Sequence, residues 1–363
     1  MLKMKATLAL TGTFCTSLLA QPIENKTIAN TQTNQLQPGY NASTDYLNHR
    51  QWDVFVTTDY LYWDWQQDSL LLGQLTPTDI FAGTTQSVFQ DPGYASGFQV
   101  GFGWNTPCED HWNLYSEYTW YKNSDTRSIT SDSGRTFQGF QGPLPYLNGT
   151  YTSKIQMKFD ALDLLLQRPF YFGKKLTANF STGLTALWIT QKLTANTNGL
   201  SSLWVIADAL APDSSIDNES ITIASSTRHK LTSWGLGPKF GLDTNWMLGY
   251  GLKIMGNLSA SFLYTQYNLN QTTSGTVALN AISRTASSQA KELHNYVVIR
   301  PITTAFLGLG WDYCFDENRY QLALSAGYDF NVYWNYNMLD FVPNKITGNM
   351  YLQGLNVQAG LAF

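Results

Sequence analysis

Residues 350–363 read MYLQGLNVQAGLAF, and the alternation in this stretch decides the fold. Apolar side chains fall at every second position, and small or polar side chains fill the positions between them. A period of two indicates a β-strand whose two faces meet different surroundings. One face is apolar except at Gln353, and its members are Tyr351, Leu355, Val357, Ala359, Leu361 and Phe363.

The same alternation recurs upstream in segments of roughly 10 to 15 residues, which is the length that a tilted strand needs to cross a bilayer. Strands of a soluble β-sandwich average only about 5 or 6 residues. The sequence therefore predicts an all-β fold, a transmembrane antiparallel up-and-down β-barrel of about ten strands, with twelve as the alternative. The predicted strands are 52–64, 94–105, 111–121, 153–167, 175–189, 231–243, 249–264, 295–312, 319–334 and 350–363.

The connections between these segments alternate in length, which is typical of barrels with short periplasmic turns and long outer loops. The loop at 190–230 also contains apolar residues at helical spacing from Leu203 to Leu210, which predicts a short helix there. The short turns are 106–110, 168–174, 244–248 and 313–318, and the long loops are 65–93, 122–152, 190–230, 265–294 and 335–349.

The first twenty residues combine Lys3 and Lys5 with an apolar stretch that ends at Ala20. This pattern predicts a secretory signal peptide over residues 1–20. Residues 21–50 are rich in Asn, Gln and Thr and show no apolar period, so we expect a flexible periplasmic lead-in. The barrel domain then covers residues 51–363, and the predicted location is a bacterial outer membrane in contact with its lipid.

Composition excludes several classes of protein. The chain is 43% hydrophobic and 14% aromatic, with a mean hydropathy of −0.22, so it is too polar for a helical membrane protein and too aromatic for a disordered one. The formal charge of −4 and the lack of a basic run argue against a nucleic-acid partner. No catalytic residue, metal site or cofactor is predicted, because the histidines are dispersed, at His49, His111, His229 and His294.

Charged residues of the predicted strands point to the lumen, because a Lys or Arg facing lipid near the midplane costs about 2–4 kcal/mol. Two interpretations stay open, namely a water-filled pore and a narrow lumen in which the charges pair. The first predicts a porin-like channel for small hydrophilic solutes and ions, and the second a structural or adhesive barrel. The candidate pore-lining residues are Asp53, Asp59, Glu117, Lys154, Lys158, Asp160, Lys239, Asp243, Lys253, Arg300 and Asp329.

Two cysteines follow the predicted signal peptide, Cys108 and Cys314, and both fall in predicted periplasmic turns. Three states of these cysteines stay open, because the compartment permits disulfides: free thiols, an internal disulfide, or disulfides to neighbouring chains. A homo-oligomer is a separate possible assembly. The terminal Phe363 is predicted to be the signal that the barrel-assembly machinery reads.

The sequence resembles the Legionella-type and chlamydia-like major outer membrane proteins. The resemblance rests on DYLYWDWQQDSL at 59–70 and on GFQVGFGWNTPCEDHWNLYSEYTW at 97–120, and YLQGLNVQAGLAF at the end supports the barrel. It implies a pore-forming barrel with porin-like function. In chlamydial members it also implies disulfide-linked assemblies, for which this chain offers only two cysteines after the predicted signal peptide.

Overall fold

The alternating segments form ten long strands in a computed structural model, which describes residues 53–68, 70–77, 84–105, 112–131, 135–139, 148–172, 175–201, 221–279, 282–315, 320–339 and 347–363. The prediction of ten barrel strands is confirmed, and the alternative of twelve is wrong. Signal peptide, lead-in and the predicted helix near 203–210 lie outside the described residues. The barrel strands are β1 (Asp53–Gln67), β4 (Tyr94–Asn105), β5 (Asn113–Ser131), β7 (Asn148–Phe172), β8 (Leu176–Ser201), β9 (Ile221–Gly249), β10 (Leu252–Leu279), β11 (Ile282–Phe315), β12 (Tyr320–Asn337) and β13 (Gly348–Ala362).

The barrel closes where its last strand meets its first. Strand β1 pairs with β4 on one edge and with β13 on the other, in a register that runs from Phe55↔Ala362 to Gln67↔Met350. Beyond these pairs, the N–H of Val54 donates to the carbonyl of Phe363 at 3.1 Å, and the N–H of Phe363 donates back at 2.9 Å. Closure leaves no free strand edge in the membrane, as hydrocarbon requires.

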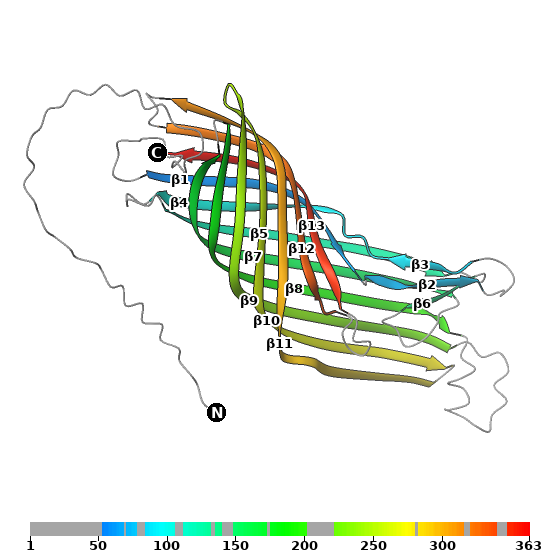
Figure 1. Cartoon of the computed structure of the whole chain (residues 1–363). Helices are drawn as coiled ribbons and strands as arrows, with labels where there is room; N and C mark the ends of the chain where they lie inside the picture. The colour runs from blue at the N-terminus through cyan, green and yellow to red at the C-terminus, as the bar shows by residue number, and fades with distance from the viewer. Residues whose placement is uncertain are drawn as a thin grey trace, which may run out of the picture. The chain divides into compact units, whose positions relative to one another are not determined.

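Several strands extend far beyond the part of the barrel that spans the membrane. Some segments predicted to be loops are therefore strands. Residues 265–294 were expected to form a loop, but the β10–β11 ladder continues from Tyr267↔Tyr296 to Leu279↔Ile282. Figure 1 shows β7 to β11 leaving the barrel together as a broad sheet. Both faces of such an extension can meet water, and the apolar alternation that marks a membrane strand is then lost.

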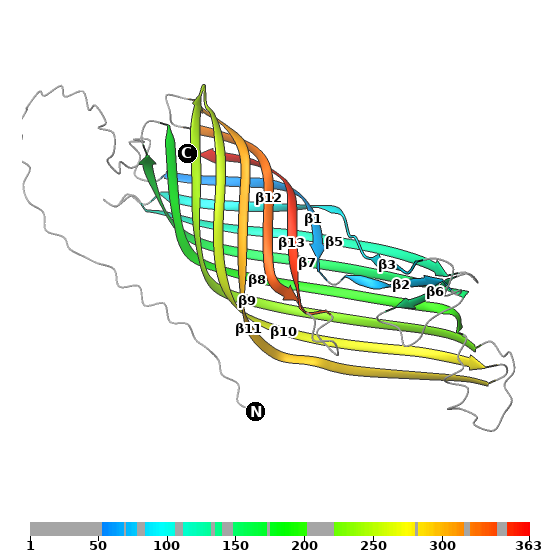
Figure 2. The same ribbon diagram turned by 45° about the vertical axis from the view of Figure 1, so that its right-hand side comes forward.

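A small second sheet lies beside these extensions. It contains β2 (Leu71–Pro77), β3 (Gln86–Phe89) and β6 (Arg135–Gly139) in the order β3-β2-β6, and it is seen at the far end of the strands in Figure 2. We call its buried apolar cluster the outer core. The outer core consists of Leu72, Val88, Ile129, Phe137, Tyr151 and Ala195.

The turn between β9 and β10 shows why one predicted boundary moved. Gly249 pairs with Leu252, which leaves Tyr250 and Gly251 as the two turn residues, with φ of 54° and 80°. Positive φ at both central residues is the mark of the tight hairpin turn that suits twisted strands. The turn predicted at 244–248 is therefore strand, and β9 continues to Gly249.

The outward face of the barrel is apolar and carries aromatic residues at two levels. Trp188 and Trp234 pair directly across β8 and β9 and are exposed, whereas Trp246 and Trp311 are exposed near the turns at the other end. Aromatic belts at both headgroup levels are typical of outer-membrane barrels. Across the described residues, no helix has the length and apolarity that crossing a membrane requires.

Candidate functional site in the barrel lumen

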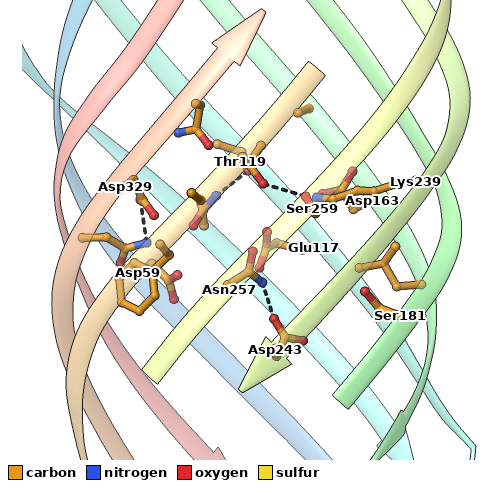
Figure 3. Close-up of a pocket in the computed structure, with 18 of the residues that line it drawn as sticks. Asp59, Glu117, Thr119, Asp163, Ser181, Lys239, Asp243, Asn257, Ser259 and Asp329 are labelled. Atoms are coloured by element: carbon orange, nitrogen blue, oxygen red, sulfur yellow. Dashed lines mark hydrogen bonds and ion pairs between the residues drawn. The ribbon is translucent and has the colours of Figure 1, made fainter. Parts of the chain in front are cut away.

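The inward faces of the membrane-spanning rows enclose a polar cavity of about 380 Å³. Figure 3 shows side chains from several strands pointing into it, including Asp59 of β1, Glu117 of β5, Lys239 of β9 and Asp329 of β12. Glycines of the inward face give larger side chains room to lie along the wall. A Cβ on Gly103 would lie only 1.9 Å from the ring of Phe55, so only glycine leaves room for that ring. The inner face of the wall therefore alternates between glycines, which leave space, and polar side chains, which point into the cavity.

Among the charged groups that line the cavity, carboxylates outnumber amines. Its described lining includes five acidic side chains and one lysine. The lysine, Lys239, forms an ion pair of 2.6 Å with Asp163, with both side chains largely buried. The lining acids are Asp59, Glu117, Asp163, Asp243 and Asp329.

The other four carboxylates are held mainly by neutral donors. The Tyr115 hydroxyl donates to Glu117 Oε2 at 2.7 Å, and Asn257 donates to Asp243. Asp329 Oδ2 accepts from the Trp63 indole at 3.1 Å and from the Asn356 amide at 3.0 Å. Gln358 donates to Asp59 at 3.3 Å. Neutral donors orient these carboxyl groups and add no positive charge, so acidic groups outnumber basic groups in the described lining of the cavity.

Five of the eleven candidate pore-lining residues line this cavity: Asp59, Glu117, Lys239, Asp243 and Asp329. Two further acidic residues were not among the predicted ones. Asp163 is the partner of Lys239, and the carboxylate of Asp312 pairs with Lys253 at 2.8 Å. Lys253 lies next to the β9–β10 turn, outside the lining of the cavity. The backbone of Asp53 pairs with Asn105, and its side chain is outside the described part.

The prediction that Lys154, Lys158 and Asp160 face the lumen is wrong. On β7 the inward residues have odd numbers, as Asp163 and Phe159 show, so these three lie on the outward face. Lys158 is paired with Asp160 at 3.0 Å, and its side chain is 56% exposed. The prediction failed because the lumen is apolar at this level. Here β7 directs its apolar residues inward and its polar residues outward.

That apolar interior forms a barrier above the cavity, towards the strand extensions. Every barrel strand contributes to it, β4 through the partly buried Ala95, and its deepest members have essentially no exposed surface. Trp63, Phe159 and Tyr333 belong both to this cluster and to the lining of the cavity, so the barrier is the outer ceiling of the cavity. We call this cluster the lumen barrier.

One candidate pore-lining residue, Arg300, lies inside the lumen barrier. Its side chain is buried, its Nε donates to the Tyr267 hydroxyl at 3.4 Å, and its guanidinium lies 5.7 Å from the centre of the Tyr267 ring. Its Nη2 contacts the sulfur of Met338 at 3.1 Å. Arg300 therefore belongs to the closed part of the lumen.

The described residues contain neither a cluster of metal ligands nor a disulfide. No group of three or more His, Cys, Asp or Glu that could hold a metal occurs within the described ranges. Cys314 lies in β11, paired with Gln321, and not in a turn as predicted. Cys314 forms no disulfide with another described residue, and Cys108 lies outside the described residues.

Comparisons with known proteins agree with the barrel. The family model described as "Legionella pneumophila major outer membrane protein precursor" matches residues 25–363. A search of curated proteins gives no match.

Among solved structures, the outer membrane protease OmpT from Escherichia coli is 10% identical, with a TM-score of 0.33, over 86% of this chain and 96% of that chain. The toluene transporter TbuX of Ralstonia pickettii is 9% identical, with a TM-score of 0.23, over 86% and 89%. The toluene transporter TodX of P. putida is 8% identical, with a TM-score of 0.23, over the same shares. Likenesses this weak carry no inference about what this chain does.

Proposed function

Because the chain belongs to the Legionella major outer membrane protein family, a family of bacterial outer-membrane proteins, we propose that it is a porin-like channel for small hydrophilic solutes and ions. The observation that carries the proposal is the acidic cavity in the lumen. A barrel that served only as a scaffold would gain nothing from placing five carboxylates in its interior, since burying charge is costly. A conduit for hydrated solutes needs such groups.

The charges of the cavity determine which ions the channel prefers. Five carboxylates face one lysine, and that lysine is already paired with Asp163. The remaining negative charge attracts cations and repels anions at close range, where the low dielectric of the wall strengthens the field. The proposed channel is therefore cation-preferring.

Reversal potentials of refolded protein in planar bilayers, measured across a KCl gradient, test this proposal. Asp329→Asn and Asp243→Asn each remove one lumenal charge at nearly constant volume. We expect each to lower the cation-to-anion permeability ratio by about 2-fold or more, as removal of a ring charge does in a narrow pore.

Asp160→Asn is the matched control, because it makes the same chemical change on the outward face. It should leave the permeability ratio unchanged. An equal shift in Asp160→Asn, or unaltered selectivity in both lumenal variants, would contradict a selectivity site in the cavity. Folded wild-type protein that never conducts would contradict the channel itself.

The lumen barrier favours a second candidate, a structural or adhesive barrel with a closed lumen. Leu61, Leu263 and Met350 have no exposed surface, so this conformation gives water no path past them. Liposome swelling with small sugars separates the two functions. Swelling supports the channel, whereas its absence with correctly folded, heat-modifiable protein supports the closed barrel.

A further inference from the structure

The lumen barrier is not made by the barrel wall alone. Tyr336, Met338 and Leu339 come from the end of β12 and the residues after it, and they are 2%, 0% and 2% exposed. We call Tyr336–Leu339 the plug segment. The continuous β12–β13 ladder ends at Tyr333↔Met350, and the segment keeps only the Asn337↔Gly348 pair with β13. Its removal from the lumen therefore leaves the pairing of the membrane-spanning strands intact.

The chain turns sharply as it enters the plug segment. Asn335 has a φ of 52°, a conformation that Asn adopts more readily than most residues, and the β12–β13 register shifts between Tyr333 and Asn337. The N–H of Asn335 donates to Asn349 Oδ1 at 2.9 Å. The bend therefore marks the point where the segment departs from the wall.

Few polar contacts attach the plug segment to the wall. The Tyr336 hydroxyl lies 3.1 Å from Ser233 Oγ. The backbone carbonyl of Tyr336 accepts a hydrogen bond from the Tyr267 hydroxyl at 3.3 Å. The Asn337 amide donates to the carbonyl of Asp68 at 2.7 Å. The ring of Tyr336 packs edge-on against Tyr267, with centroids 5.5 Å apart. Apolar packing holds the remainder of the segment, and such packing is lost when water enters.

Arg300 is the feature that sets this barrier apart from an ordinary apolar core. Its residue surface is 7% exposed, yet among the described residues it forms no ion pair with a carboxylate. A thioether sulfur is a weak acceptor for one of its five N–H donors. A buried cation without an anionic partner is costly, and hydration of the site would relieve that cost.

We infer that the plug segment is a gate in the lumen, closed by its apolar side chains and biased towards opening by Arg300. This inference rests on the proposed channel function and names how that channel is regulated. In the closed state Tyr336, Met338 and Leu339 keep the barrier dry. When the segment withdraws, water reaches Arg300 and joins the acidic cavity to the outer side.

The two components of this gate predict opposite effects on single-channel recordings in planar bilayers. Met338→Ser together with Leu339→Ser weakens the apolar closure and should raise the open fraction several-fold. Arg300→Met removes the buried charge and keeps an apolar side chain, so it should lower the open fraction several-fold. If these residues had only a structural role, the serine variants and Arg300→Met would shift the open fraction in the same direction.

Leu72→Ser is the matched control, because Leu72 is equally buried but lies in the outer core. It should leave the open fraction unchanged. Each variant is first checked for heat-modifiable migration, which shows that the barrel has formed.

A cross-linking experiment tests the gate by fixing the plug segment to the barrel wall. Ser233→Cys and Tyr336→Cys are combined in a chain that also carries Cys108→Ser and Cys314→Ser. A short bis-maleimide, to which both thiols add, then joins the segment to β9. Cross-linked protein should lose most of its conductance, whereas Tyr336→Cys alone, in the same background and treated in the same way, should still conduct.

Conductance that survives cross-linking, or variants that all shift the open fraction in one direction, would overturn the gate and leave the channel standing. Absence of conductance from wild type and from every folded variant would overturn the channel, and the gate with it.

Discussion

At the scale of single residues, His229 is a buried histidine whose protonation depends on its surroundings. It lies on β9 five residues before Trp234, in the extension of the strand outside the membrane-spanning part, and is 5% exposed. Neither ring nitrogen has a hydrogen-bond partner among the described residues. Burial lowers the pKa of His229 below its ordinary value of 6.5, because desolvation disfavours the charged imidazolium.

The lowered pKa predicts that acid destabilises the folded protein. Below about pH 6.5 the unfolded chain binds a proton at His229 that the folded chain does not. The contribution of neutral His229 to the free energy of unfolding is therefore complete above that pH and is lost as the pH falls. Urea unfolding in detergent at pH 7.5 and pH 5 measures the loss. His229→Leu should reduce the pH dependence, and the exposed His294→Asn should retain it. Equal pH dependence in His229→Leu and wild type would contradict the assignment.

Single residues also show where sequence reasoning reached the site and where it could not. Asp59, Glu117 and Asp329 were placed in the lumen correctly in orientation, because their outward neighbours are apolar. Lys158 was misplaced because β7 inverts its pattern, with Phe159 facing the lumen barrier and Leu164 facing lipid. Alternation shows that two faces differ but does not say which face is inside, and only the tertiary structure reveals an apolar lumen.

At the scale of elements, the seam between β1 and β13 depends on the last residue of the chain. Phe363 exchanges two backbone hydrogen bonds with Val54 and is 43% exposed on the outward face. Deleting Phe363 removes both hydrogen bonds and the apolar ring, whereas Phe363→Leu keeps the hydrogen bonds and most of the apolar surface. We expect the deletion to lower the yield of assembled barrel several-fold, and Phe363→Leu to lower it little.

The yield is measured as heat-modifiable protein in isolated outer membranes. A deletion that assembles at the wild-type yield would show that the seam closes without this residue.

The same scale explains which elements could be foreseen. Strands such as β4 and β12 were predicted nearly to the residue, because lipid on one face imposes a strict alternation. The extensions of β10 and β11 were taken for a loop, since Ser and Thr occur on both faces from Thr272 to Ser288. Backbone pairing holds that ladder together with polar contacts such as the one between the Thr276 and Thr285 hydroxyls, 3.1 Å apart. No pattern of hydrophobicity indicates it.

At the scale of the whole described barrel, two separate apolar clusters stabilise different parts of the same strands. The lumen barrier fills the barrel, and the outer core joins β2, β3 and β6 to the extensions of β5, β7 and β8. The two clusters share no residue. Damage to the outer core should therefore stay local, because the hydrogen-bond ladder of the barrel is closed independently of it.

Phe137→Ala tests this independence. Phe137 is 1% exposed and its ring packs 4.9 Å from that of Tyr151, so its truncation should cost the outer core about 3–5 kcal/mol. A protease added to intact cells should then cut the small sheet much faster than in wild type. The barrel should keep its heat-modifiable migration and its conductance, because the closed ladder and the lumen barrier remain. Loss of the folded barrel in Phe137→Ala would instead mean that the outer core and the membrane-spanning strands unfold as one cooperative unit.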